Sequence, residues 1–316
     1  MRRDTCDGQA VRHAVAGSED AGQRVDNFLF RELKGVPKGH VYRLLRTGQV
    51  RVNGRRVKPT NRLEAGDDIR IPPVKQASAK PSAPTGQNLG WLADCIIYED
   101  DSLLVLNKPA GLAVHGGSGL SLGAIEALRA LRPQAPYLEL VHRLDRETSG
   151  CLLIAKRRSR LRAMHEVLRS GQVEKKYLAL LSGHLNDAGA VTAALRKHQV
   201  AGGERRVHVD ESGKAAETHF KPLTMYGQGT LVEARILTGR THQIRVHAAH
   251  LGHPVAGDDK YGEHETNREW RRLGLKRMFL HAASISFTAP WNDVPLAFDA
   301  PLDSELRAVL DRLEER

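Results

Sequence analysis

Residues 142–156 read HRLDRETSGCLLIAK, a polar stretch that passes directly into an apolar one. The apolar part, GCLLIAK (150–156), is short and uninterrupted, which is typical of a strand buried within a sheet. The polar part, HRLDRETSG (142–150), is then expected to be a loop beside that sheet. Polar side chains on a loop held against a rigid strand are well placed for catalysis or binding. We therefore expect the chemistry of this chain at the start of this strand.

The rest of this region reads as strands joined by few helices. Because the strands outnumber the helices and often follow one another directly, we expect an α+β fold with a mixed, largely antiparallel sheet and helices packed on it. Strands are expected within DCIIYEDDSLLVLNKPAG (94–111), VEKKYLALLSG (173–183), THFKPLTMYGQGTLVEARILTG (218–239) and MFLHAASISFTAP (278–290), and helices within LSLGAIEALRALRP (120–133), SRLRAMHEVLRSG (159–171) and RTHQIRVHAAHLG (240–252).

A break in composition divides the chain into two modules. Residues 73–90 read PVKQASAKPSAPTGQNLG, without apolar periodicity, and are expected to be a flexible linker. The predicted small module covers residues 20–72 and the predicted large one residues 91–316. Residues 1–19 are expected to be a flexible N-terminal tail.

The small module reads as two helices followed by a small sheet. GQRVDNFLFRELK (22–34) and GHVYRLLRTG (39–48) place their apolar residues at helical spacing. QVRVNGRRVKP (49–59) is a predicted hairpin, because Asn53-Gly54 is a strong turn signal. Many cations stand in this module, which favours a phosphate-contacting face over an ordinary solvated surface. They are Arg24, Arg31, Lys34, Lys38, Arg43, Arg46, Arg51, Arg55, Arg56 and Lys58.

Bulk properties narrow the class of protein. The 316 residues include 48 Lys and Arg against 37 Asp and Glu, a formal net charge of +11 that attracts phosphate backbones. No apolar run is long enough to span a membrane, and the N-terminus lacks the apolar core of a signal peptide. The three cysteines are far apart, which fits a reducing cytosol. The chain has no GxGxxG or GxxxxGK[ST] loop, so dinucleotide and nucleoside triphosphate sites are not supported.

Two polar stretches carry the candidate chemistry. Asp145 lies between Arg143 and Arg146, and neighbouring cations favour the ionised, reactive form of a carboxylate. From the residues alone, a turn with a surface ion pair is the simpler interpretation. The second stretch is GRTHQIRVH (239–247), with Thr241 as the expected helix N-cap. Its histidines form no HxxxH pair and have no acidic companion, so no metal site is expected.

The small module resembles a known RNA-binding domain. RVDNFL (24–29), HVYRLLRTGQVRVNG (40–54) and LEAGDDIRI (63–71) are similar to the domain of ribosomal protein S4 type, also called the alpha-L motif. This resemblance implies that the module docks structured RNA.

The large module resembles the RluA family of pseudouridine synthases. HRLDRETSG (142–150) is similar to the signature of that family, EKKYLAL (174–180) to its second motif and TGRTHQIRVHAAHLGHPVAGDDKYG (238–262) to its third. NKPAGLAVHGG (107–117) and FLHA (279–282) fit the same family. Together with the small module, the pattern is similar to the RluC branch first and the RluD branch second, which modify large-subunit ribosomal RNA.

The resemblance implies a role for each matched residue. Asp145 matches the catalytic aspartate, Tyr177 the tyrosine that stacks on the flipped base, and Arg245 the arginine that pairs with the aspartate. Ile244 matches the apolar residue that packs on the target ring, and Arg143 a residue that fills the space the nucleotide leaves. Taken singly, Tyr177 and Ile244 would be assigned to the core and Arg143 and Arg240 to the surface. Further RNA-contacting residues are expected at His142, Arg240, Arg43, Arg46, Arg51 and Lys38.

The resemblance implies isomerisation of specific uridines to pseudouridine in 23S ribosomal RNA, through base flipping. Substrate and product are isomers, so no cofactor, metal or nucleotide is expected. The expected partner is ribosomal RNA, free or in an assembling large subunit, and the protein is expected to be a cytoplasmic monomer with no membrane association. Two alternatives stay open at this point: a non-catalytic ribosome-assembly factor, and a synthase that acts on another structured RNA such as tRNA.

Overall fold

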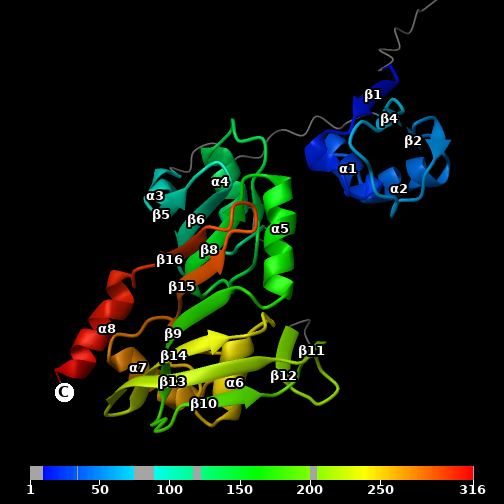
Figure 1. Cartoon of the computed structure of the whole chain (residues 1–316). Coiled ribbons are helices and arrows are strands. Elements are labelled where there is room, and N and C mark those ends of the chain that lie inside the picture. Colours follow the sequence, from blue (N-terminus) through cyan, green and yellow to red (C-terminus); the bar gives the residue numbers. More distant parts are fainter. Residues whose placement is uncertain (1–9, 34, 75–88, 117–121, 200–204, 316) are drawn as a thin grey trace, which may run out of the picture. The chain divides into compact units, whose positions relative to one another are not determined.

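The computed structural model describes residues 10–33, 35–74, 89–116, 122–199 and 205–315. It divides into two compact units, Met1–Gln87 and Asn88–Arg316 (Figure 1). In the described part of the chain, no helix is long and apolar enough to cross a membrane. Most of the predicted linker at 73–90 lies outside the described residues.

The first unit packs two helices against a four-stranded sheet. The strand order is β1-β4-β2-β3, and the core contains Phe28 and Leu29 of α1, Val41 and Leu44 of α2, and Ile69 of β4. The elements are β1 (Arg12–Val15), a short 3-10 helix (Ser18–Asp20), α1 (Val25–Glu32), α2 (Lys38–Arg46), β2 (Arg51–Val52), β3 (Arg55–Arg56) and β4 (Asp68–Ile71).

For this unit the structure confirms one sequence prediction and contradicts another. The hairpin is confirmed: β2 pairs with β3, and Asn53 and Gly54 have the positive φ angles (49° and 75°) that this tight turn requires. The flexible tail at 1–19 is wrong for residues 12–15, because β1 pairs with β4 along its whole length. Its sequence, RHAV, is too short and polar to signal a strand, and edge pairing with β4 stabilises it.

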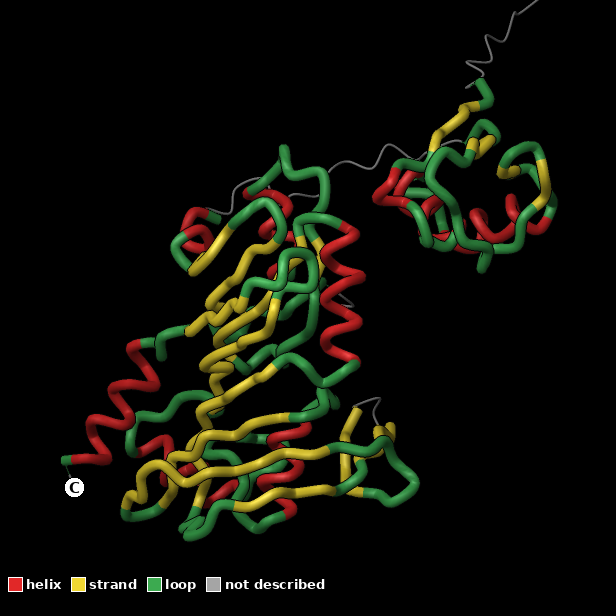
Figure 2. The backbone as a smooth tube through the Cα atoms, viewed as in Figure 1, coloured by secondary structure: helices red, strands yellow, loops and turns green. Residues whose placement is uncertain are grey.

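The second unit is built on a ten-stranded sheet, which Figure 2 shows as a continuous band. The strand order is β10-β13-β14-β9-β15-β8-β6-β5, with β16 beside β15 and β7 beside β8. Strands β11 and β12 form a separate hairpin. The strands are β5 (Ile96–Glu99), β6 (Leu103–Lys108), β7 (Glu139–Leu140), β8 (Ser149–Ala155), β9 (Glu174–Ser182), β10 (Gly189–Thr192), β11 (Leu195–Gln199), β12 (Arg205–Val209), β13 (Glu217–Tyr226), β14 (Gly229–Ile236), β15 (Leu280–Thr288) and β16 (Pro295–Asp299).

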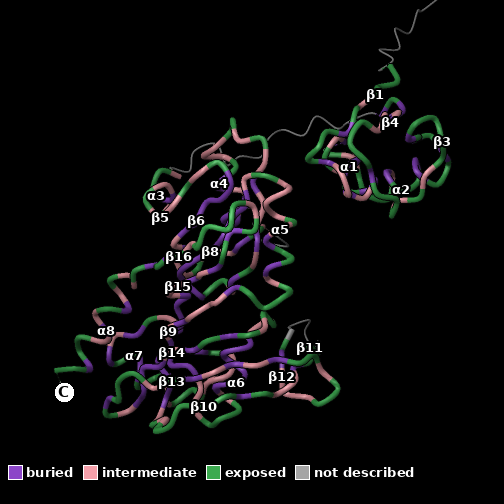
Figure 3. Tube along the Cα trace, viewed as in Figure 1, coloured by how far each residue is buried: buried purple, intermediate pink, exposed green. Residues whose placement is uncertain are grey.

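Helices cover both faces of this sheet, so its centre is buried (Figure 3). Leu152 and Ile154 of β8 pack in one cluster with α4 and α6, whereas Cys151 and Leu153 pack on the other face against α5. Burial on both faces explains why the strand reads as an unbroken apolar run. The helices are α3 (Gly90–Ala93), α4 (Ala124–Leu131), α5 (Arg158–Arg169), α6 (Gln243–His250), α7 (His264–Arg272) and α8 (Ser304–Glu314).

The sheet is mixed and largely antiparallel, as predicted. Strands β8 and β15 run parallel, with His281 opposite Ser149 and Ala282 opposite Gly150, and every other strand pairing that the structure describes is antiparallel. Gly150 has φ of +108°, and a Cβ there would lie 2.2 Å from the carbonyl oxygen of Ala282. Glycine is therefore required where the polar loop enters the sheet.

Candidate active site

Asp145 lies in the loop between β7 and β8, as the sequence predicts. The N–H of Thr148 donates to the carbonyl of Asp145 at 3.2 Å, which closes a turn in the loop. The next carbonyl, that of Arg146, accepts from the N–H of Gly111 at 2.9 Å and from Lys108 Nζ at 3.0 Å. These bonds fix the backbone on the C-terminal side of Asp145.

Lys108 is a buried anchor for this loop. Its Nζ donates to the carbonyls of Pro109, Leu112 and Arg146 at 2.9, 2.8 and 3.0 Å. Burial lowers the pKa of Lys108 to about 7. Three carbonyl acceptors match the three N–H bonds of an ammonium group, so the geometry favours the charged form.

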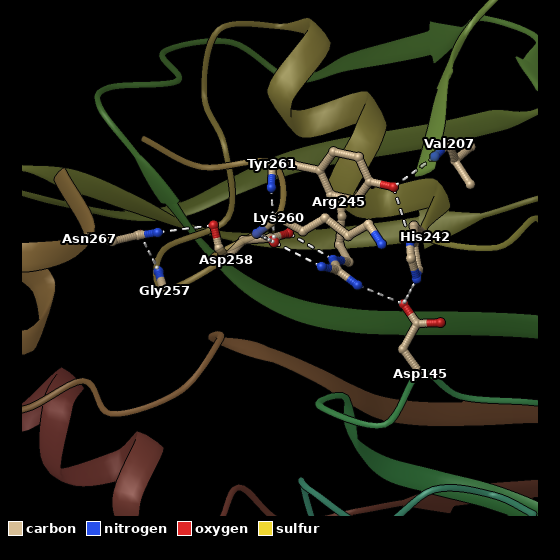
Figure 4. A network of polar contacts seen from close by, with 9 residues as sticks. All are labelled: Asp145, Val207, His242, Arg245, Gly257, Asp258, Lys260, Tyr261 and Asn267. Atoms are coloured by element: carbon tan, nitrogen blue, oxygen red, sulfur yellow. Dashed lines mark hydrogen bonds and ion pairs between the residues drawn. The ribbon is translucent and has the colours of Figure 1, made fainter. Parts of the chain in front are cut away.

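Arg245 of α6 joins two carboxylates (Figure 4). Its Nε and Nη2 donate to the two oxygens of Asp258 at 2.7 and 2.8 Å, a bidentate pair. Its Nη1 donates to Asp145 Oδ2 at 3.2 Å. Burial by itself would lower the pKa of Arg245, but the hydrogen bonds and charge of Asp258 outweigh it and raise the pKa. The guanidinium is therefore a permanent cation that points one N–H at Asp145.

His242 approaches the same carboxylate oxygen, and Tyr261 contacts His242 in turn. His242 Nε2 lies 3.7 Å from Asp145 Oδ2, and His242 Nδ1 lies 2.8 Å from the Tyr261 hydroxyl. That hydroxyl accepts from the N–H of Val207 on β12 at 3.1 Å. If it donates its own proton to Nδ1, the Nε2–H of a neutral His242 faces Asp145 (Figure 4). Burial lowers the pKa of His242, which favours that neutral form.

A pocket opens beside Asp145. Tyr177 of β9 and Ile244 of α6 supply apolar walls and are 7% and 5% exposed, whereas the Asp145 side chain is 26% exposed. Burial raises the pKa of Tyr177, so its hydroxyl stays protonated at neutral pH. The pocket thus combines a reachable carboxylate with an apolar and aromatic wall. Its other lining residues include Arg143, Leu144, Thr148, Ile236, Arg240 and Leu280.

Comparison with known proteins identifies this arrangement. Residues 102–250 match the family described as RNA pseudouridylate synthase, and residues 23–69 match the S4 domain. Over 310 residues, the chain is 52% identical to the ribosomal large subunit pseudouridine synthase C of Haemophilus influenzae, covering 97% of this chain and 96% of that one. The chain belongs to the RNA pseudouridylate synthase family. The family and the RNA-binding domain that the sequence motifs predict are therefore confirmed.

Other members of the family agree with this assignment. The synthase of the same name from Escherichia coli is 52% identical over 309 residues, covering 96% of this chain and 97% of that one. A solved structure, human RNA pseudouridylate synthase domain containing 4, superposes with a TM-score of 0.60 at 27% identity, covering 72% of this chain and 95% of that chain. Both the sequence and the fold of the pseudouridylate synthase unit are thus shared with relatives.

The structure brings most of the predicted site residues of this family together. Asp145, Tyr177 and Arg245 line one pocket, although they come from a loop, a strand and a helix that are far apart in sequence. Ile244, Arg143 and Arg240 line it as well. Arg43, Arg46, Arg51 and Lys38 belong to the other unit, where all four are exposed on α2 and β2.

His142 does not line this pocket. Its Nε2 accepts a hydrogen bond from the backbone N–H of Leu153 at 3.2 Å. Burial lowers the pKa of His142 to about 4, so the ring is neutral. The structure thus gives His142 a role in holding the loop against β8, and RNA contact by its partly exposed ring stays a prediction.

Three polar partners of the site were missed from sequence. They are Lys108, in the motif at 107–117, and Asp258 and Tyr261, in the motif at 238–262. Nothing in the local sequence distinguishes Asp258 from its neighbour Asp259. One general signal was available: a buried arginine needs a buried carboxylate partner in addition to a carboxylate that faces the substrate.

The predicted N-cap at Thr241 is also wrong. Helix α6 begins at Gln243, and His242 stands at the N-cap in a left-handed conformation with φ of 55°.

Proposed function

We propose that this protein converts specific uridines to pseudouridine in large-subunit ribosomal RNA, with Asp145 as the catalytic carboxylate. The observation that carries the proposal is the geometry of Arg245. Asp258 holds its guanidinium bidentately, and the remaining N–H orients an accessible Asp145 at the edge of a pocket with an aromatic wall. The names of the relatives support the choice of ribosomal RNA.

The reaction breaks the bond from C1′ to N1 of uridine and forms one from C1′ to C5, while the proton on C5 is lost and N1 gains one. Atoms and electrons balance without an oxidant or a nucleotide. Asp145 would act on the ribose, as nucleophile at C1′ or as a base, while Tyr177 and Ile244 hold the ring. A base inside a helix cannot reach this pocket, so the target nucleotide must flip out of its stack. Arg143, at the pocket wall, would face the space that it leaves.

The S4 unit would dock the RNA. Its exposed cations, among them Arg43, Arg46, Arg51 and Lys38, suit phosphate contacts that position a substrate without reading its sequence. Because the proposed substrate is synthesised and assembled in the cytosol, we expect the protein to act there. We expect it to act as a monomer, because one chain supplies the whole described pocket.

The test is complementation in cells that lack the protein. Ribosomal RNA from these cells is mapped for pseudouridine before and after rescue with wild type, Asp145→Asn or Asp259→Asn. Asp259 is a matched control, because its side chain is 76% exposed and pairs with Arg271 at the surface. We expect the missing modifications to return with wild type and with Asp259→Asn only. Their return with Asp145→Asn would refute the catalytic role, and an unchanged map in the deletion strain would refute the substrate.

A further inference from the structure

The S4 unit contains a hollow that its general basic character does not explain. It lies between α2 and the chain that follows β3, with a volume of about 570 Å³, in the size range of small-ligand sites. Leu45, Val57 and Pro59 supply apolar surface within it. A cleft that only followed a phosphate backbone would not need an apolar floor.

Tyr42 presents an aromatic ring at this hollow. The residue is 43% exposed, although a tyrosine usually buries most of its ring. Phe30 braces it in an edge-to-face contact, with ring centroids 5.7 Å apart and planes at 83°. Lys38 Nζ in turn lies 5.5 Å from the centroid of Phe30. The Tyr42 ring is therefore held in place and still open to a partner.

Three cations line the same hollow. Arg46 of α2, Arg56 of β3 and Lys58 are exposed, and in the described part of this unit the ion pairs involve other side chains. The Arg56 side chain packs over Gly48, where a Cβ would lie 2.3 Å from its Nε. That contact holds the cation at the wall of the hollow, and among the described residues no acidic side chain lines the site.

The hollow combines an exposed aromatic face, an apolar floor and cations without an ion-pair partner in the described part of this unit. Such a surface suits a nucleotide that is not base-paired. The base stacks on the ring and the cations neutralise its flanking phosphates. A protein segment could fill an apolar groove, but three cations without a carboxylate favour a polyanion. We propose that Tyr42 is a stacking platform for an unpaired base of the docked RNA, flanked by phosphate contacts from Arg46, Arg56 and Lys58. This inference rests on the proposed function, because it takes RNA as the substrate.

The experiment measures the affinity of the full-length protein for a ribosomal RNA fragment that the wild type modifies, at several salt concentrations. The variants are Tyr42→Ala, Tyr42→Leu, Tyr42→Phe and Arg46→Ala. Trp91→Ala is the matched control, since Trp91 is an aromatic residue of similar exposure, 45%, in the other unit. Tyr42→Leu keeps apolar bulk in the position, so a result remains available if the alanine variant folds poorly.

We expect Tyr42→Ala and Tyr42→Leu to weaken binding about 5- to 150-fold, the range for losing one stacked base. The salt dependence and the single-turnover rate at saturating RNA should not change. Tyr42→Phe and Trp91→Ala should bind like wild type, whereas Arg46→Ala should lower the salt slope by about 1.

Wild-type affinity in Tyr42→Ala and Tyr42→Leu would overturn the stacking role, as would an equal loss in Tyr42→Phe. Unchanged RNA affinity with weakened binding to assembling ribosomal particles would assign the hollow to a protein partner and also overturn it. Because wild type must modify the fragment for the experiment to proceed, failure of the proposed function appears separately from failure of this inference.

Discussion

Asp258→Asn tests the most interior part of the active site. The Asp258 carboxylate is fully buried and accepts four hydrogen bonds, two from Arg245 and two from the backbone N–H groups of Lys260 and Tyr261, at 2.7–3.2 Å. An asparagine oxygen in the place of Oδ1 could keep three of these bonds. Its amide NH₂ would then face the N–H of Arg245 Nε, and two hydrogen-bond donors cannot bond to each other. The buried guanidinium would also lose the negative charge of the Asp258 carboxylate beside it.

The expected loss of folding free energy follows from the burial of the Arg245–Asp258 ion pair. Removing one partner of a buried ion pair costs about 3–5 kcal/mol of folding free energy. Asparagine keeps the shape and most of the hydrogen bonds, and Asp145 still contacts Arg245 at 3.2 Å, so we expect the lower end, about 3 kcal/mol. For a unit the size of Asn88–Arg316, this corresponds to a fall in melting temperature of about 6–12 °C.

Thermal unfolding of the full chain, followed by circular dichroism, measures this change against Asp259→Asn. The control removes a surface carboxylate that is 76% exposed, so it should alter stability by less than about 1 kcal/mol. Turnover should also fall in Asp258→Asn, because Arg245 no longer has a fixed direction toward Asp145. Equal melting temperatures for Asp258→Asn and the control would show that the buried ion pair does not stabilise the site.

Two further predictions concern the loop around Asp145. Burial lowers the pKa of His142 to about 4, against about 6.5 in the unfolded chain. The contribution of the neutral ring to folding stability is therefore complete above pH 6.5, and up to about 3 kcal/mol of it is lost as the pH falls toward 4. His142→Gln, which can still accept from Leu153, should flatten this pH dependence in denaturant titrations, and an unchanged slope would contradict it. Gly150→Ala should abolish soluble expression, because its Cβ would overlap the Ala282 carbonyl. The control, Gly171→Ala, also has positive φ but lies in open space, so it should lower the free energy of unfolding by only about 1–2 kcal/mol. Equal melting temperatures for the two variants would exclude the proposed overlap.

Local signals predicted the elements of the fold well. The apolar run of β8 and the Asn53-Gly54 turn are encoded within a few residues, and the structure confirms both. Strand β1 was missed because its stability comes from pairing with β4, more than fifty residues later. The parallel pairing of β8 with β15 joins positions 149 and 281, and nothing local at either position encodes it.

The candidate site divides in the same way. Asp145, Tyr177 and Arg245 were predicted from motifs, and the structure places them in one pocket. The hydrogen bond from Leu153 to His142 could not be predicted, because a histidine next to a polar loop reads alike whether its ring faces RNA or the backbone of β8. The left-handed conformation of His242 was not predicted, because positive φ is uncommon outside glycine and the contacts of this ring with Tyr261 and Asp145 are tertiary.

Asp258 explains how Arg245 can orient Asp145 and still leave one of its oxygens open, as the proposed catalytic role requires. If Arg245 had no other partner, it would form its bidentate pair with Asp145 and occupy both of that carboxylate's oxygens. Because Asp258 takes two of the N–H groups of Arg245, only Oδ2 of Asp145 is engaged, and in the described part of the protein no group bonds to Oδ1. The two carboxylates and the guanidinium together carry one negative charge. That charge is therefore available on an open oxygen beside Tyr177, where a flipped nucleotide would present its ribose.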